Sequence, residues 1–153
     1  MVINSSVVIA LSHLHQLRNL NKIHQVIVST AVYLEITENG AGLTGDADLR
    51  DAVKVCEITL KTPSDGLLVL ALIDPLGEAE TIALAKQEDA TAVLDDRQAR
   101  AKAKTLNIPT QGTLRTLKQL DDAGYLTDTT LRQAVERLTE IGFYINKKVT
   151  DEL

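Results

Sequence analysis

Short apolar runs alternate with longer segments of helical period along most of the chain. Strand-like runs are predicted at residues 1–3, 24–28, 91–94 and 108–110. Each of them is followed by polar capping residues and then by a segment with helical spacing. This alternation is typical of a parallel sheet covered by helices. The chain is therefore predicted to form a three-layer α/β/α fold with a central, mainly parallel sheet.

The remaining pattern predicts where the helices and one further strand lie. Helices are expected over the following ranges: 7–11, 31–38, 62–72, 77–88, 97–106, 114–123 and 130–141. Residues 53–60 alternate apolar and polar positions and predict a half-exposed edge strand, in which Cys56 is expected to be buried as a small apolar side chain. The glycine-rich residues 40–45 predict a loop, with a lid as the alternative.

Length and composition limit the function classes. The 153 residues, 44% of them apolar, predict one domain over residues 1–153 with a core of its own. The 21 acidic against 16 basic residues give a net charge of −5, which excludes a protein that coats nucleic acid by bulk attraction. With no Trp, three Tyr and one Phe, a row of rings that stack on bases is also disfavoured.

Cysteine content and hydropathy indicate the compartment. A single Cys excludes an internal disulfide framework and a cysteine-based zinc site, so a reducing cytoplasm is the expected location. The chain has no apolar stretch of membrane-spanning length and no basic start followed by a long apolar run. No membrane association is expected.

Acidic and amide side chains follow several of the predicted strands or begin the helices after them. Ligands of parallel sheets gather at the carboxyl ends of the strands, so these side chains are candidates for one site. They are Asn4, Glu35, Glu80, Asp95 and Asp96, with Glu78 as a neighbour. Hard cations such as Mg²⁺ prefer oxygen ligands of this kind. Arg97, Arg100 and Lys104 share one helix face and could hold phosphates at the rim.

Each of these features has a plain structural alternative. Asp95 or Asp96 can cap a helix, first-turn acids stabilise any helix dipole, and a basic run is usually a solvated face. The sequence contains no GxxxxGK[ST], GxGxxG or GxSxG motif. This disfavours nucleotide triphosphatases, Rossmann dehydrogenases and serine hydrolases of the usual kinds.

Five short strings, in order and at suitable spacing, carry a family resemblance. They are residues 4–11 (NSSVVIAL), 29–35 (STAVYLE), 77–85 (GEAETIALA), 94–100 (LDDRQAR) and 111–114 (QGTL). Together they resemble the PIN-domain superfamily, in particular its small prokaryotic branch related to VapC-type toxin ribonucleases. The resemblance covers nearly the whole chain.

The resemblance implies an acidic pocket that binds Mg²⁺ or Mn²⁺ and uses activated water to hydrolyse RNA. It carries Glu35, Glu80 and Asp95 over as catalytic acids. The implied metal ligands are Asn4, Glu35, Glu80, Asp95 and Asp96, and the implied secondary site residues are Ser5, Ser6, Glu78 and Thr113. One departure is that Asn4 stands where the family usually has Asp. Asn offers a neutral oxygen and cannot act as a base.

Three functional hypotheses follow. The first is a metal-dependent ribonuclease that acts on RNA, as the toxin restrained by a small antitoxin protein. The second is a PIN-fold module, impaired by Asn4, that binds RNA or protein without cleaving RNA. The third is a winged-helix-like DNA regulator built from residues 117–126, 130–141 and 143–145, which the near-cancelling charges of the recognition helix disfavour. A homodimer is expected because residues 67–73 (LLVLALI) are more apolar than a solvent-facing helix, although burial against the sheet would explain them equally well.

Overall fold

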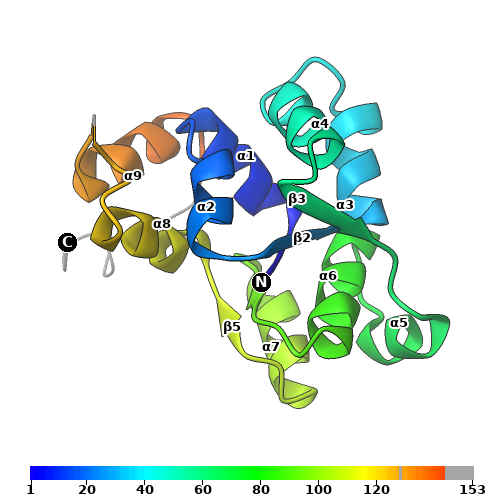
Figure 1. The fold of residues 1–153 in the computed structure, drawn as a ribbon. Coiled ribbons are helices and arrows are strands. Elements are labelled where there is room, and N and C mark those ends of the chain that lie inside the picture. Colours follow the sequence, from blue (N-terminus) through cyan, green and yellow to red (C-terminus); the bar gives the residue numbers. More distant parts are fainter. Residues whose placement is uncertain (128, 144–153) are drawn as a thin grey trace.

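A computed structural model describes residues 1–127 and 129–143, and its centre is a parallel sheet (Figure 1). The strands of the described part are β1 (Val2–Ile3), β2 (Val26–Ser29), β3 (Ile58–Lys61), β4 (Ala92–Val93) and β5 (Thr110–Gln111). Their order across the sheet is β3-β2-β1-β4-β5, and every pair is parallel. The predicted α/β fold with a central parallel sheet is confirmed.

Alternate strand residues enter two separate cores, one on each face of the sheet. Ile3 and Val93 enter one core, while Val2 and Ile27 enter the other. All four side chains are buried. A sheet covered on both faces needs apolar residues at every strand position, and this is why its strands appear as continuous apolar runs in the sequence.

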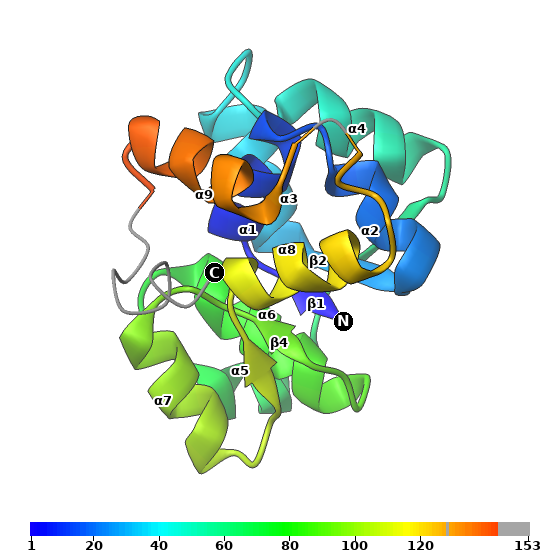
Figure 2. The ribbon, with the colours of Figure 1, turned by 90° about the vertical axis from the view of Figure 1, so that its left-hand side faces the viewer.

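Helices form the two outer layers (Figure 2). Those whose residues enter the core of Ile3 are α1 (Ser5–His13), α2 (Leu17–Ile23), α3 (Thr30–Leu34), α4 (Asp46–Lys54), α8 (Thr113–Asp122) and α9 (Leu131–Glu140). Those on the face of Val2 are α5 (Asp65–Ala71), α6 (Leu76–Gln87) and α7 (Arg97–Thr105). No helix of the described residues is long and apolar enough to cross a membrane.

The region of residues 46–60 differs from the prediction. The expected strand 53–60 is wrong, because α4 extends to Lys54 and β3 begins only at Ile58. Leu49 and Ala52 are three residues apart and both buried, and this helical spacing of core contacts favours a helix over a strand. β3 is an edge strand, as predicted. The expected burial of Cys56 is also wrong: it is exposed, with φ 59°, in the turn between α4 and β3.

The predicted helix 31–38 is continuous but changes its winding. After α3, the segment η1 (Glu35–Asn39) forms a π-helical turn that ends where the Gly40 N–H donates to the Glu35 carbonyl at 3.0 Å. π turns are rare and occur often at functional sites. The predicted last strand, 108–110, is shifted to β5 at Thr110–Gln111.

Candidate active site

Asp95 directly follows β4 and is held by hydrogen bonds from two other elements. The backbone N–H of Thr113, at the start of α8, donates to Oδ1 at 2.8 Å, and the Thr113 hydroxyl donates to Oδ2 at 2.7 Å. The Ser6 hydroxyl lies 3.0 Å from the same Oδ2. Because β1 and β4 are neighbours, the residues that follow them meet at one edge of the sheet.

Asn4 is the N-cap residue of α1 and is only 3% exposed. Its Oδ1 accepts from the Val7 N–H at 3.3 Å and lies 2.9 Å from the Ser6 hydroxyl. A hydroxyl has one proton, so Ser6 donates to either Asn4 or Asp95 at a given moment. The Asn4 oxygen is therefore already engaged by protein donors.

Glu35 is the first residue of the π turn η1, and its side chain meets the start of α1. The Ser5 hydroxyl donates to Glu35 Oε2 at 2.6 Å. Gly77, in the first turn of α6, faces the same carboxylate. A Cβ at Gly77 would lie 3.0 Å from Glu35 Oε2 and 3.4 Å from Val32 Cγ2. The missing side chain lets α6 approach Glu35 closely.

Glu78 and Glu80 of α6 have different environments. Glu80 is buried, and its Oε2 accepts from the Ala31 N–H of α3 at 2.7 Å. It therefore joins α6 to the first turn of α3. Glu78 Oε2 is buried without a hydrogen-bond partner. Burial raises the pKa of the Glu78 carboxyl, its own backbone N–H partly opposes this, and the charges of Glu35 and Asp96 raise the pKa further.

Asp96 is the N-cap of α7, where its Oδ1 accepts from the Ala99 N–H at 2.7 Å. Asp96 is therefore a helix cap, which was the structural alternative to a site role, and its charge also acts on Glu78. Asp96 therefore starts the basic helix and contributes to the field of the acidic cluster at the same time.

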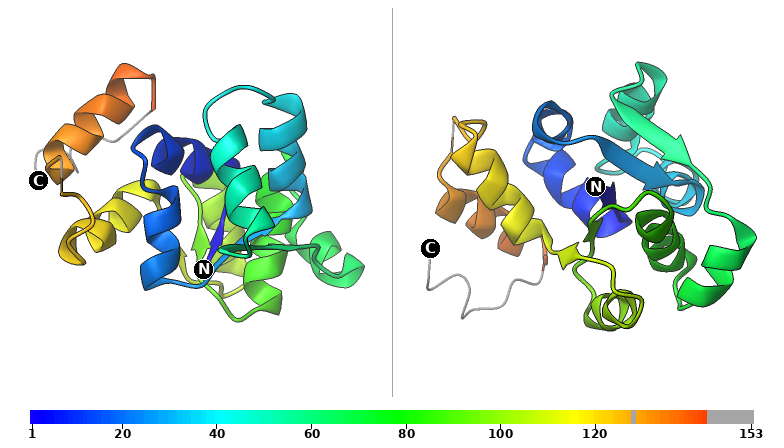
Figure 3. Two further views of the ribbon diagram at one scale, coloured as in Figure 1. Left: turned by 45° about the horizontal axis from the view of Figure 1, so that its top comes forward. Right: turned by 60° about the horizontal axis from the view of Figure 1, so that its bottom comes forward.

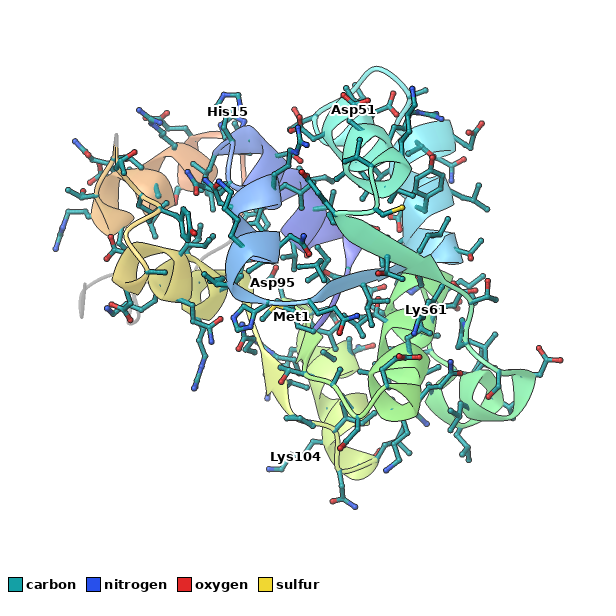
Figure 4. The ribbon with its side chains drawn as sticks, in the orientation of Figure 1. Met1, His15, Asp51, Lys61, Asp95 and Lys104 are labelled. Atoms are coloured by element: carbon teal, nitrogen blue, oxygen red, sulfur yellow. The ribbon has the colours of Figure 1, made fainter. Side chains whose placement is uncertain are left out.

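The basic residues of α7 are spread along the helix. Arg100 Nη1 and Asp95 Oδ1 both border Gly112, where an added Cβ would lie 3.4 Å from the nitrogen and 3.1 Å from the oxygen. Arg97 is exposed in the first turn. Lys104 lies near the other end of the helix, well away from Asp95 (Figure 4). The structure brings Arg100 to the site and leaves Lys104 outside it.

The candidate site residues described above fall into two groups. The charges of Glu35 and Asp96 both act on Glu78, and we call these three residues the acidic cluster. Asn4 and Asp95 share Ser6 and are occupied by internal hydrogen bonds. Within residues 1–127 and 129–143, no three His, Cys, Asp or Glu side chains lie close enough together, as placed in the structure, to hold a metal ion.

The acidic cluster nevertheless fits a hydrated divalent cation. Mg²⁺ commonly takes only one or two carboxylates and keeps several waters. The Glu78 oxygen, buried without a donor, is a group that a cation would satisfy, and Glu35 adds the second negative charge. The fit therefore depends on these two residues and not on a cage of four acids.

Gly77 and Gly112 belong to two of the five strings that carry the family resemblance, but the sequence analysis gave neither of them a role at the site. Both leave space beside a site carboxylate, Gly77 beside Glu35 and Gly112 beside Asp95. The available signals were membership of these strings and the position of each glycine next to a candidate residue, Glu78 and Thr113 respectively. A glycine in the first turn of a helix has many explanations, so this signal is weak without the structure.

Comparison with known proteins places this geometry in a family. A family model for the PIN domain matches residues 1–153. The chain belongs to the PIN-domain family. No curated protein matches the chain significantly. PIN domains are in general a nuclease family, so the acidic residues at the carboxyl edge of this sheet belong to a nuclease-type domain.

Proposed function

We propose that this PIN domain is a metal-dependent ribonuclease whose centre is the acidic cluster of Glu35, Glu78 and Asp96. The observation that carries the proposal is the Glu78 carboxylate, which has a buried oxygen without a partner and two further carboxylates nearby. Buried charge without a donor is costly unless a cation or a proton neutralises it. Membership of a nuclease family supports this interpretation.

The residues of the cluster would hold Mg²⁺ or Mn²⁺ through Glu78 and Glu35, with Asp96 adding negative charge. When bound, such an ion activates water for attack on a phosphodiester and stabilises the leaving oxygen. The Ser5 hydroxyl fixes the orientation of Glu35 by donating to its Oε2. Glu80 and Asp95 hold the surrounding helices through Ala31 and Thr113.

RNA would approach this acidic site through local positive charge. Arg100 lies beside Asp95, and Arg97 is exposed one turn earlier on α7. Guanidinium groups bind phosphate through paired N–H donors. We therefore assign Arg97 and Arg100 to the RNA backbone at the rim and give Lys104 no direct part in the site.

We extend the proposal to a cytoplasmic toxin that a small antitoxin protein restrains. Its support is the resemblance of the five strings to VapC-type toxins. Induced expression of the chain in a bacterium that lacks the antitoxin should arrest growth, and Glu78→Gln should relieve the arrest. Normal growth at confirmed wild-type expression, or arrest by both forms, would contradict the toxin role.

A second candidate is a PIN-fold module that binds RNA without cleaving it. Asn4 favours this candidate, because it contributes no charge and its oxygen is used within the fold by Val7 and Ser6. Both candidates have the PIN fold, and both would bind RNA phosphates through Arg97 and Arg100. They differ in whether the remaining acids are sufficient for hydrolysis.

Cleavage assays with defined variants test the proposal. Wild-type protein should cleave single-stranded RNA with Mn²⁺ and not with EDTA, and Glu78→Gln should reduce the rate by about 100-fold or more. Glu88→Gln is a matched control, because it makes the same change at the C-cap of the same helix, outside the cluster. Cleavage that persists in EDTA would refute metal dependence.

Asn4→Asp separates the two candidates. If the wild type is inactive and Asn4→Asp cleaves RNA, the module is the better description of the natural chain. If neither protein cleaves RNA although both bind Mn²⁺ by calorimetry, the ribonuclease proposal fails.

A further inference from the structure

The guanidinium group of Arg50 connects α4 to the π turn η1. Arg50 Nη2 donates to the carbonyl oxygen of Thr37, and Nε donates to Asp46 Oδ1 at 2.6 Å. The same Nη2 lies 3.4 Å from Glu38 Oε1. Figure 1 and the left view of Figure 3 show α4 beside α3 and η1, with residues 40–45 as the loop that joins them. Arg50 therefore bridges two consecutive helical segments.

Arg50 supplies a donor where η1 ends. The last four carbonyls of a helix have no N–H partner within the helix, and the Thr37 carbonyl lies in this last turn. The Thr37 side chain is buried, and its hydroxyl donates to the Tyr33 carbonyl at 2.8 Å. A cation at this end of a helix is also favoured by the helix dipole. Arg50 thus provides both a hydrogen bond and a positive charge to the end of the turn.

Gly40 closes the same turn. Its N–H donates to the Glu35 carbonyl at 3.0 Å. A Cβ at this position would lie 2.8 Å from the Ile36 carbonyl oxygen and 3.3 Å from that of Glu35, so a larger residue does not fit without a shift of the backbone. Glu35 is therefore the first residue of a turn that Gly40 closes and Arg50 holds at its end.

Asp46, the first residue of α4, fixes both Arg50 and the loop. Its Oδ1 accepts from Arg50, and its Oδ2 accepts from the Gly42 N–H at 2.8 Å. The Gly42 N–H and Arg50 hold the pKa of the Asp46 carboxyl below its usual value, so the group is charged at neutral pH. The four-residue spacing of Asp46 and Arg50 favours their ion pair. The contact at Gly42 ties residues 40–45 to α4, which favours the predicted loop over a lid.

We propose that Arg50 is a positioning residue for Glu35 and acts through the backbone of η1. The wound turn directs the Glu35 carboxylate to the Ser5 hydroxyl, 2.6 Å from Oε2, and to the space beside Gly77. A turn that rewinds from π to α geometry rotates its side chains about the helix axis. The consequence for RNA cleavage rests on the proposed function, whereas the position of Glu35 does not.

Amide hydrogen exchange tests whether Arg50 holds the turn. The Gly40 N–H should exchange at least about tenfold faster in Arg50→Gln than in the wild type, because the turn opens more often. The Tyr125 N–H is the internal control, since it makes a hydrogen bond of the same five-residue spacing to the Leu120 carbonyl, at 2.9 Å, after α8. Its exchange rate should not change.

Arg18→Gln is the matched control variant. Arg18 also forms an ion pair through two donors, with Glu57, and its side chain is 53% exposed against 43% for Arg50. This variant should leave the π turn unchanged. Arg50→Lys keeps the positive charge but loses the planar fork that reaches two partners together, so it should lie between Arg50→Gln and the wild type. Circular dichroism shows that each variant is folded.

The side-chain carboxyl carbon resonance of Glu35 reports the position of this group without metal. Ser5→Ala removes the hydroxyl donor and gives the resonance of the unbonded carboxylate. In EDTA, the Glu35 resonance of Arg50→Gln should move towards that of Ser5→Ala, and in Arg18→Gln it should stay at the wild-type value. A general loss of stability in a folded variant would not move this single resonance.

RNA cleavage is measured separately. In a wild type that cleaves RNA with Mn²⁺, Arg50→Gln should lower kcat by about tenfold and leave KM within about twofold, because the geometry at Glu35 changes and the contacts with RNA do not. A wild type that cleaves no RNA refutes the proposed function, and the exchange and resonance measurements then decide the role of Arg50 without it.

Four results would overturn the proposal. They are Gly40 exchange that stays at the wild-type rate in Arg50→Gln, Gly40 and Tyr125 exchange that rise equally, a Glu35 resonance that does not move, and equal effects of Arg18→Gln. The second and the fourth would show that losing any such ion pair loosens the whole fold.

Discussion

Thr113 holds the carboxylate of Asp95 from two directions, with its backbone N–H 2.8 Å from Oδ1 and its hydroxyl 2.7 Å from Oδ2. Asp95 follows β4, and Thr113 begins α8. This pair therefore connects the end of a central strand to the N-terminus of a helix on one face of the sheet. A carboxylate at a helix N-terminus is also favoured by the helix dipole.

Replacing Thr113 by Val removes the hydroxyl while keeping the branched shape. Because a fully buried threonine makes this hydrogen bond to a partly buried charged group, we expect a loss of about 1–3 kcal/mol in the free energy of unfolding. Urea unfolding at neutral pH measures it. Thr113→Ser keeps the hydroxyl and should lose less. Equal losses in the two variants would show that packing, and not the hydrogen bond, is what matters.

Gly77→Ala should separate stability from activity. The new Cβ would lie 3.0 Å from Glu35 Oε2, so the exposed carboxylate must rotate away from its present position. Ala also favours the helix by about 0.5–1 kcal/mol. We expect a melting temperature close to that of the wild type and at least a roughly tenfold loss of RNA cleavage, because the site geometry changes. Unchanged cleavage would contradict the position assigned to Glu35.

Glu78 should make the metal-free protein less stable as the pH rises. Its pKa is raised above the usual 4.5 by burial, with Glu35 and Asp96 adding to the shift. A raised folded-state pKa contributes stability below the unfolded pKa that is lost as the pH rises through the folded pKa. Glu78→Gln should therefore unfold at a higher temperature than the wild type at pH 7 in EDTA, and the difference should vanish as the pH falls to about 4.

Glu88, the C-cap residue of the same helix, provides the control of opposite sign. Its pKa is lowered by Lys61, whose Nζ lies 2.6 Å from Glu88 Oε2, and by Gln87. A lowered pKa contributes stability above the unfolded pKa that is lost as the pH falls through the folded pKa. Glu88→Gln should thus be slightly less stable than the wild type at pH 7 and equal to it in acid. The same pH dependence in both variants would contradict the environments described for them.

Arg100 and Lys104 should differ in their effect on RNA binding. Arg100 lies beside Asp95, and Lys104 lies towards the distal end of α7 (Figure 4). Arg100→Gln should weaken binding of single-stranded RNA in EDTA and reduce the salt dependence of log K by about 0.7, the value for one phosphate contact. Lys104→Gln should change both quantities less. Fluorescence anisotropy at several salt concentrations measures them, and equal effects would assign RNA to the whole face of α7.

The fold could be predicted largely because both faces of the sheet are covered. Strands buried on two sides must be apolar throughout, so residues 1–3, 24–28 and 91–94 are visible as runs in the sequence. The helix at residues 46–54 was missed for the opposite reason. Only Leu49 and Ala52 are buried on it, and its last residues continue into an alternating pattern that resembles a strand.

The candidate site was predictable in its location and less so in its details. Glu78 and Glu80 are two residues apart, and on a helix this spacing points them in different directions. Which one faces the site depends on how α6 is rotated, and this rotation is fixed by Ile82 and Ala83 packing under the sheet. Likewise, the capping hydrogen bond of Asp96 and the occupied oxygen of Asn4 depend on backbone N–H groups that sequence patterns do not locate.

The shared Ser6 hydroxyl gives Asn4 a role in folding. If position 4 carried a carboxylate, two negative groups would flank a single hydroxyl proton, and one of them would be driven to take up a proton or a cation. The amide removes that conflict, because it adds no second charge beside the Ser6 hydroxyl, and Ser6 and Thr113 both contact Asp95 Oδ2. The hydrogen bonds around Asn4 and Asp95 are thus made within the protein alone, so we expect this part of the site to fold in the absence of divalent ions.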